Sequence, residues 1–422
     1  MPFYHIWTIG CQMNKADSQR IASYLEKIGY QASPKAEEAE IIVLNSCVVR
    51  QSAEDRVINK LGSLKSLKRR QNPILALTGC LVDSRVDDLR RRLPQVDLFF
   101  KPQAFFELCR FLEERGLALE RLDSGLVPPS PRPSAFVPII QGCNKFCTYC
   151  IVPYRRGRER SRPLEEIICE VEELASRGVR EVTLLGQNVD SYGHDLPEKP
   201  DLAAILGELS RVDGLARIRF LTSHPKDMGQ RLLEAMAQLE KVCEHLSIPI
   251  QAGDDDILRA MRRGYTVAQY RQLIERIRSA IPDIALSTDV IVGFPGEREE
   301  QFQRSYDLLG ELRFDTVHVA CYSPRPGTIA SRRLTDDVPY EEKVRRREMI
   351  EHLQEGIVTE INAQLLGSTV EVLVENRKNE KWWGRTRTDK LVFFEDEADR
   401  LGQLVKVRIE KTSPWSLQGK VE

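Results

Sequence analysis

The chain of 422 residues carries a formal net charge of −1 and contains 41% hydrophobic and 30% charged residues. This length allows two to four domains with cores of their own, and the composition is typical of a soluble globular protein. The near-zero net charge excludes a global positive field that would attract nucleic acid.

The sequence also lacks signals for membrane insertion or secretion. Its apolar runs fall well short of the roughly 18 residues of a membrane span. The segment from Met1 to His5 has no basic stretch followed by an apolar one. Ten cysteines are too sparse for a disulfide scaffold, and their spacing indicates metal ligation in a reducing compartment. We therefore expect a cytoplasmic protein.

Residues 1–122 are predicted to form a domain with a parallel α/β sheet. Short apolar strands are expected at 5–9, 41–44 and 74–77. A helix capped by Asp17 or Ser18 should follow the first strand. Cys11, Cys47 and Cys80 each come just after one of these strands. Because loops converge at the carboxyl edge of a parallel sheet, the three thiols could meet there as cluster ligands. For each cysteine alone, a small buried hydrophobe is the commoner role.

A proline-rich segment, residues 123–134, predicts a semi-rigid linker. After it, six candidate strands alternate with helices, which suits a partial (β/α)6 barrel over residues 135–366. The strands are expected at 136–141, 181–185, 216–221, 246–250, 285–292 and 316–320. One of the helices should begin at Pro163, a favoured first-turn residue, and a charged helix should fill 340–366.

Three cysteines gather in the loop after the first of these strands. Cys143, Cys147 and Cys150 are separated by three and by two residues. A four-iron cluster normally takes four thiolates, so a loop that supplies three leaves one iron open to a small molecule. Zinc is the alternative, but zinc sites usually pair C-x2-C with a distant C-x2-C or histidine pair, which this sequence lacks. The spacing favours an iron–sulfur cluster.

Polar residues follow the other barrel strands as well. The candidate cofactor-binding residues are Gln187, Asn188, Ser223, Gln251 and Asp289. Glycines beside them let the backbone approach a ligand, and their side chains can bond a ribose or an amino group. For each residue alone, a role in a turn is the alternative. As a ring around one barrel mouth, they are better explained together as a cofactor and substrate pocket.

Residues 367–422 are expected to form a small antiparallel β barrel. Its strands are predicted at 369–374, 391–394 and 404–409. The segment from Lys381 to Arg387 mixes tryptophans and cations, which is the composition of a base-stacking RNA surface. A hairpin with core tryptophans explains this segment equally well. Basic clusters elsewhere in the chain make any RNA site a local patch.

Several motifs follow one another in a characteristic order. They are Gly10-Cys11-Gln12-Met13-Asn14, Asn45-Ser46-Cys47, Gly79-Cys80, the Gly142–Cys150 loop, Val152-Pro153-Tyr154 with Arg156-Gly157, Leu185-Gly186-Gln187-Asn188-Val189, Ser223-His224-Pro225, Ile291–Glu297 and Arg325-Pro326-Gly327-Thr328. Together they resemble the methylthiotransferases, a family of radical S-adenosylmethionine (radical SAM) enzymes, and most of all their MiaB group, the tRNA-2-methylthio-N6-dimethylallyladenosine synthases. Two departures are the acidic run 254–256 and Asp389, where an asparagine is common.

The resemblance implies an N-terminal cluster domain, a radical SAM domain and a C-terminal TRAM domain. It implies two 4Fe–4S clusters, one on the Cys143–Cys150 loop with S-adenosylmethionine (SAM) at its open iron, and one on Cys11, Cys47 and Cys80. It implies that a methylthio group is added to carbon 2 of N6-isopentenyladenosine next to the tRNA anticodon. The carbon–hydrogen bond there is not acidic and has no leaving group, so its cleavage needs radical chemistry from cofactors.

The implied partners are the tRNA anticodon arm, an electron donor such as flavodoxin or ferredoxin, and a sulfur source; we expect a monomer without membrane contact. The alternative substrates are threonylcarbamoyl-adenosine in tRNA and an aspartate of a ribosomal protein. A non-catalytic iron–sulfur electron carrier or RNA-binding protein is the alternative from another class. Cys109, Cys169, Cys243 and Cys321 are predicted to be packing residues.

Overall fold

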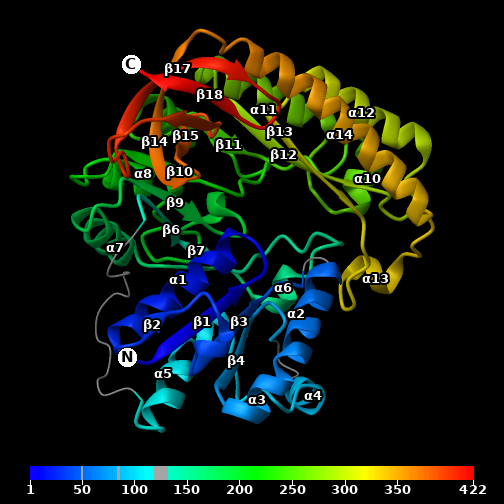
Figure 1. The fold of residues 1–422 in the computed structure, drawn as a ribbon. Helices are drawn as coiled ribbons and strands as arrows, with labels where there is room; N and C mark the ends of the chain where they lie inside the picture. Colours follow the sequence, from blue (N-terminus) through cyan, green and yellow to red (C-terminus); the bar gives the residue numbers. More distant parts are fainter. Residues whose placement is uncertain (49–50, 83–85, 118–131) are drawn as a thin grey trace. The chain divides into compact units, whose positions relative to one another are not determined.

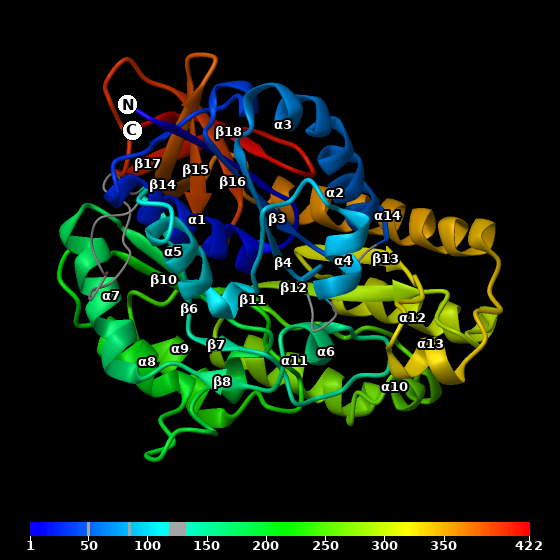
Figure 2. The same cartoon turned by 90° about the horizontal axis from the view of Figure 1, so that it is seen from below.

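The computed structural model describes residues 1–48, 51–82, 86–117 and 132–422 and contains two compact units (Figures 1 and 2). The first unit comprises Met1–Pro131, Gln141–Asn144 and Cys150–Arg158. The second comprises Arg132–Ile140, Lys145–Tyr149 and Glu159–Glu422. Most of the predicted linker, 123–134, lies outside the described residues. The C-terminal domain expected from the sequence and most of the central one fall in the second unit, whereas 141–144 and 150–158 belong to the first.

A five-stranded parallel sheet with the order β2-β1-β3-β4-β5 forms the centre of the first unit. Its strands are β1 (Phe3–Thr8), β2 (Gln31–Ala32), β3 (Ile41–Ser46), β4 (Ile74–Gly79) and β5 (Leu98–Phe99). Every residue of β3 is buried, as expected for a central parallel strand that is covered on both faces. The predicted parallel α/β sheet is confirmed.

Helices pack on both faces of this sheet. They are α1 (Gln12–Lys27), α2 (Gln51–Ser63), α3 (Lys65–Gln71), α4 (Val86–Arg92) and α5 (Phe106–Glu113), and the short helix α6 (Val152–Arg155) also belongs to the unit. Alternate residues of β3 enter two separate cores, because successive side chains of a strand point to opposite faces. Ile42 lies in the core that includes Val57 of α2, whereas Val43 lies in the core that includes Leu25 of α1.

The start of α1 corrects the sequence prediction. The helix begins at Gln12 with Cys11 at its N-cap, and not at Asp17 or Ser18. Both of these side chains are engaged elsewhere: the Ser18 hydroxyl lies 2.8 Å from that of Thr8, and Asp17 forms an ion pair. They face the interior from within the helix, so neither is available to cap its N-terminus.

Six parallel strands in the second unit form the predicted partial barrel. They are β6 (Ser134–Pro138), β9 (Glu181–Leu185), β10 (Arg217–Phe220), β11 (His245–Ser247), β12 (Ala285–Val292) and β13 (Thr316–Cys321). They pair in sequence order as two three-stranded sheets, β6-β9-β10 and β11-β12-β13. The sheets join where the Ile218 amide donates to the Lys241 carbonyl (2.7 Å) and the Cys243 amide donates to the Ile218 carbonyl (3.0 Å).

Strand β11 ends at Ser247, short of the predicted Ile250, since Pro249 has no amide to donate to a neighbouring strand. The helices of this unit are α7 (Leu164–Ser176), α8 (Leu202–Leu209), α9 (Gln230–Gln238), α10 (Asp255–Ala260), α11 (Val267–Ala280), α12 (Glu299–Leu312), α13 (Ile329–Arg333) and α14 (Tyr340–Ala363). Pro163 precedes α7 as its N-cap. Within the described ranges, no helix has the length and apolarity needed to cross a membrane.

The C-terminal residues form a closed barrel with the strand order β14-β15-β16-β18-β17. The strands are β14 (Thr369–Lys378), β15 (Lys381–Thr386), β16 (Leu391–Glu395), β17 (Leu404–Thr412) and β18 (Leu417–Val421). The three predicted strands are present, and β15 and β18 are additional. All neighbouring strands run antiparallel except β16 and β18, which are parallel.

Candidate metal centres and cofactor pocket

Three cysteines of the first unit follow three neighbouring parallel strands. Cys11 comes after β1, Cys47 after β3 and Cys80 after β4, as the sequence predicts. Cys11 is exposed, whereas Cys47 and Cys80 are buried. Among the described residues, no three acidic, histidine or cysteine side chains converge on the position of a single metal ion. A four-iron cluster does not require the three thiols to meet at one point, because each thiolate binds a different iron. Thiols on neighbouring strand ends fit such a cluster.

The loops that carry these thiols are held by glycines and buried amides. Gly79 has a φ of +94°, and a Cβ at this position would lie 2.2 Å from the Ser46 carbonyl oxygen, so a side chain cannot be accommodated. The Asn14 side chain donates to Asn45 Oδ1 (2.9 Å) and to the Ser46 carbonyl (2.8 Å). Asn45 Nδ2 donates back to the Asn14 carbonyl (2.7 Å). This buried amide pair fixes the loop after β3 against the start of α1.

Arg156 is a buried arginine that the sequence analysis did not select as a site residue. Its Nε donates to Cys80 Sγ (3.4 Å), and its Nη2 lies 3.4 Å from Asn14 Oδ1 and 3.0 Å from Asp17 Oδ2. Burial raises the pKa of the Asp17 carboxyl, while the charge of Arg156 opposes that shift. Burial likewise raises the pKa of the Cys80 thiol against the influence of Arg156. The guanidinium therefore forms part of the surroundings of this cysteine set.

The loop of the second cysteine set is shaped by close backbone contacts. Gly142 has a φ of +80°, and a Cβ there would lie 2.0 Å from the Arg158 carbonyl oxygen. The Cys143 amide donates to the Gly157 carbonyl (3.1 Å). Cys143 and Cys147 are buried and Cys150 is half-buried. Cys143 and Cys150 belong to the first unit and Cys147 to the second.

Cys147 has a cationic neighbour that sequence reasoning missed. Arg263 Nη1 lies 3.4 Å from Cys147 Sγ, and Arg263 Nη2 donates to the Pro249 carbonyl (3.0 Å). The Thr148 amide and hydroxyl bind the carbonyls of Met261 and Ala260. The turn after α10 therefore supports the cysteine loop. No spacing rule in the sequence relates Arg263 to a thiol more than a hundred positions away.

Four of the five predicted cofactor residues follow the ends of neighbouring barrel strands, and the fifth, Asp289, lies within β12. Asn188 Nδ2 donates to Asp227 Oδ2 (2.7 Å), and the Ser223 hydroxyl donates to Asp190 Oδ1 (2.9 Å). The Gln251 amide donates to the carbonyl of Asp289, in β12, at 2.9 Å. Gln187 lies two positions after the end of β9. The structure places these residues on adjacent strands, and their contact with a cofactor stays a prediction.

Charged residues around Ser223 and His224 form a buried network. Lys145 Nζ donates to Asp227 Oδ1 (2.7 Å). Burial raises the pKa of Asp190 to about 7, although it accepts hydrogen bonds from the Ser223 hydroxyl and the His224 amide. Burial, reinforced by the charge of Arg263, lowers the pKa of His224 to about 3, so its imidazole is neutral at physiological pH.

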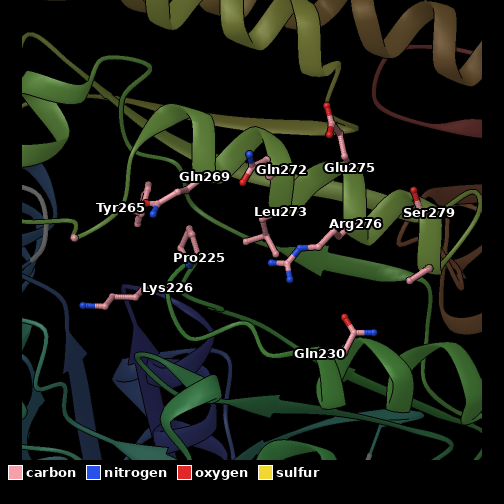
Figure 3. Close-up of a pocket in the computed structure, with 12 residues that line it drawn as sticks. Pro225, Lys226, Gln230, Tyr265, Gln269, Gln272, Leu273, Glu275, Arg276 and Ser279 are labelled. Atoms are coloured by element: carbon pink, nitrogen blue, oxygen red, sulfur yellow. The ribbon is translucent and has the colours of Figure 1, made fainter.

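A surface pocket lies elsewhere in the second unit. It has a volume of about 1070 Å³ and is bordered by Gln230 of α9 and by residues of α11 such as Gln272 and Arg276 (Figure 3). Pro225 and Lys226 reach it from the loop after β10. None of the predicted cofactor residues lines this pocket, so it is distinct from the expected cofactor site.

The basic and aromatic segment of the C-terminal barrel has partners within the second unit. Trp382 is buried, and a Cβ on Gly384 would lie 1.9 Å from the Leu373 carbonyl oxygen. Arg387 forms an ion pair with Glu244 (2.6 Å) and donates to the Val242 carbonyl. These contacts favour the core alternative for Trp382 and a docking role for Arg387.

Buried arginines of β10 complete this docking region. Arg219 Nη1 donates to the Arg387 carbonyl (2.7 Å), Nη2 to the Thr386 carbonyl (2.5 Å), and Nε lies 3.0 Å from Glu181 Oε1. Arg217 donates to the Arg385 carbonyl (2.7 Å). Carbonyls of β15 and of the turn after it are thus bound to the amino-terminal end of the central barrel.

Comparisons with known families agree with this architecture. The model described as Uncharacterized protein family UPF0004 matches residues 4–101, that of the Radical SAM superfamily matches 137–309, and that of the TRAM domain matches 363–421. The solved structure of the radical S-adenosylmethionine methyltransferase TsrM from Kitasatospora setae has a TM-score of 0.55 at 13% identity, covering 78% of this chain and 74% of that chain. The structure of the cobalamin-dependent S-adenosylmethionine radical enzyme OxsB has a TM-score of 0.51 at 13% identity, covering 83% of this chain and 56% of that chain.

The fold and the three-cysteine loop define a radical SAM protein, a class whose members use SAM and a 4Fe–4S cluster. Curated relatives named tRNA-2-methylthio-N(6)-dimethylallyladenosine synthase define the family further. That of Dehalococcoides mccartyi (strain CBDB1) is 55% identical, covering 100% of this chain and 99% of the relative. The relative from Chloroflexus aurantiacus is 50% identical, covering 99% of this chain and 91% of the relative. The chain belongs to the tRNA-2-methylthio-N6-dimethylallyladenosine synthase family, which confirms the resemblance found in the sequence.

Proposed function

We propose that this protein is a tRNA methylthiotransferase that adds a methylthio group to carbon 2 of N6-isopentenyladenosine beside the anticodon. The observation that carries the proposal is the presence of two three-cysteine sets, on strand ends in the first unit and on the loop after β6. The chain also ends in a TRAM barrel. The printed name of its relatives supports this nucleoside as the product in tRNA.

Each three-cysteine set would hold one 4Fe–4S cluster. Cys143, Cys147 and Cys150 would leave one iron for SAM, and the set of Cys11, Cys47 and Cys80 is also one ligand short. When bound, the clusters and SAM supply an organic radical and the sulfur that is transferred, for which the protein has no side-chain substitute. The protein contributes the positions of the thiolates and the cations beside them.

Two buried polar atoms support a ligand pocket at the strand ends. In the described part of the chain, Asn188 Oδ1 and His224 Nε2 have no hydrogen-bond partner. His224 Nδ1 accepts from the Lys226 amide (3.2 Å), so in the neutral ring Nε2 carries the proton and is free to donate. One acceptor and one donor would suit the hydroxyls or the amino group of SAM or of a nucleoside.

We assign the RNA-binding role of the C-terminal barrel to the outer side of β17 and the loop after it. Trp415 is 65% exposed in this loop. Asn362 Nδ2 of α14 anchors the loop by donating to the carbonyls of Ser413 (2.8 Å) and Pro414 (3.1 Å). An exposed, anchored aromatic ring is suited to stacking on an unpaired base.

Cations accompany this tryptophan. Lys406 and Arg408 point outward from β17, and Arg408 lies opposite Lys420 of β18. Glu410 pairs with Lys420 at 3.1 Å, but neither Lys406 nor Arg408 has an ion-pair partner among the described residues. Lys420 already has Glu410 as its counterion, whereas Lys406 and Arg408 could bind an RNA phosphate.

Mass spectrometry of tRNA nucleosides tests the proposal. We expect a strain that lacks this chain to lose the 2-methylthio derivative and accumulate N6-isopentenyladenosine, and the wild-type chain to reverse both changes. Loss of the methylthio derivative of threonylcarbamoyl-adenosine, with the isopentenyl nucleoside unaffected, would assign the chain to the other tRNA substrate and overturn the proposal. A normal nucleoside profile would exclude both.

A further inference from the structure

Arg156 links two of the three segments that carry Cys11, Cys47 and Cys80. It lies six positions beyond Cys150, and its side chain is almost completely buried. It contacts Cys80 after β4, and it contacts Asn14 and Asp17 on α1. Cys11 is the N-cap of that same helix. The guanidinium therefore connects the surroundings of Cys80 with those of Cys11.

The hydrogen bonds of this guanidinium are incomplete. Nε and Nη2 have partners, but in the described part of the chain buried Nη1 has none. A buried donor without an acceptor is destabilising, and more so when it is charged. Such an atom beside a cysteine of a three-ligand set points to a missing acceptor, and anionic sulfur is the acceptor that the proposed function provides.

The Asp17 carboxylate offsets the positive charge of Arg156. Its carboxylate lies 3.0 Å from Arg156 Nη2 and is itself nearly buried, so the pair is close to neutral as a whole. The carboxylate holds Nη2 and leaves Nε and Nη1 for other acceptors. Asp17 thus fixes one edge of the guanidinium, where Nε reaches Cys80, and Nη1 remains a donor without an acceptor among the described residues.

We propose that Arg156 is a positioning residue of the cluster that Cys11, Cys47 and Cys80 would hold, here called the auxiliary cluster. Its Nε donates to the Cys80 thiolate, and its Nη1 donates to a cluster sulfur. This inference rests on the proposed function, because it requires a cluster on Cys11, Cys47 and Cys80. Hydrogen bonds to sulfur and nearby positive charge stabilise the reduced, more negative state of a cluster and raise its reduction potential. Arg156 therefore makes this cluster easier to reduce.

The test isolates the auxiliary cluster in the full-length chain. In the background Cys143→Ala/Cys147→Ala/Cys150→Ala, only the cluster on Cys11, Cys47 and Cys80 can form. Its iron content is measured by iron analysis, and its midpoint potential is measured by a redox titration followed by electron paramagnetic resonance. We expect Arg156→Gln to make the potential more negative. If the reduced form is favoured about tenfold less, the shift is about 59 mV for one electron. Arg156→Lys should restore part of it.

Arg158→Gln is the matched control, because Arg158 is an exposed arginine two positions further along the same segment. It should leave the potential unchanged. An unchanged potential in Arg156→Gln with full iron content would overturn the inference. Loss of iron from Arg156→Gln that Arg156→Lys restores would support it, whereas loss from both variants would assign Arg156 a purely structural role and overturn it. If the background chain itself binds no iron, the proposed function fails instead.

Discussion

The buried ion pair between Arg219 and Glu181 gives the sharpest stability prediction. Both side chains are at most 5% exposed, at 3.0 Å from each other. Arg219→Met would leave the Glu181 carboxylate buried without its cation, and it would remove the donors for the Thr386 and Arg387 carbonyls. Breaking a buried pair from one side costs about 3–5 kcal/mol. Since folded proteins are stable by about 5–15 kcal/mol, this is a large fraction of the total.

Urea unfolding followed by tryptophan fluorescence measures this loss. Three of the four tryptophans, Trp382, Trp383 and Trp415, lie in the C-terminal barrel that Arg219 docks, and the experiment uses a Trp7→Phe background to remove the signal of the first unit. We expect the double variant Glu181→Gln/Arg219→Met to recover part of the stability, because the unpaired charge is gone.

Arg211→Met is the matched control for this experiment. Arg211 pairs with Glu208 at 2.8 Å, but its side chain is 75% exposed. Exposed pairs contribute only about 0–1 kcal/mol. If Arg219→Met cost no more than Arg211→Met, the buried pair would not be what holds the C-terminal barrel on the central one.

Three further predictions concern the thiols, the RNA face and pH. Gly79→Ala places a Cβ 2.2 Å from the Ser46 carbonyl oxygen, so we expect about half of the iron to be lost on reconstitution, with the Cys143–Cys150 loop still loaded. If one base stacks on Trp415, Trp415→Ala should weaken tRNA binding by about 1–3 kcal/mol in a filter-binding assay. Trp383→Ala should weaken tRNA binding less than Trp415→Ala does. Burial raises the pKa of Asp190 to about 7 in the folded chain, from about 3.8 in the unfolded chain, so the folded chain binds this proton more tightly. The wild-type chain should therefore lose stability between about pH 4 and 7, and urea midpoints of Asp190→Asn should lack that part of the slope.

Local sequence patterns predicted many of the strands and helices and the cysteines that follow the strands. The apolar run of β3 and the cysteine after it are adjacent in the sequence, so both the strand and the position of Cys47 at its end could be read together. The same holds for Cys80 after β4. The buried face of α7, with Ile167, Val171 and Leu174, follows from helical periodicity alone.

The contacts that complete the sites are long-range, which explains why they were missed. Arg156 and Cys80 are 76 positions apart, and Arg263 and Cys147 are 116 apart. Arg156 belongs to a motif of the sequence, Arg156-Gly157, but nothing in the local pattern relates either arginine to its cysteine.

Two strands of the C-terminal barrel, β15 and β18, were not among the predicted strands. Glycine weakens an ordinary strand, and each of these two contains one: Gly384 in β15 and Gly419 in β18. In the closed barrel, a Cβ at either position would lie about 2 Å from a carbonyl oxygen of a neighbouring strand. Closure of the barrel, which no local pattern encodes, makes glycine the residue that fits.

The central claim is that the two three-cysteine sets hold separate clusters with different tasks. The most direct measurement compares two full-length variants, each with one set changed to alanine, for iron content, 5′-deoxyadenosine formation from SAM and methylthiolation of tRNA. We predict about half of the wild-type iron in each. The variant without Cys11, Cys47 and Cys80 should still form 5′-deoxyadenosine but no methylthio nucleoside, and the variant without the Cys143–Cys150 thiols should form neither. Methylthiolated tRNA from either variant would contradict the account.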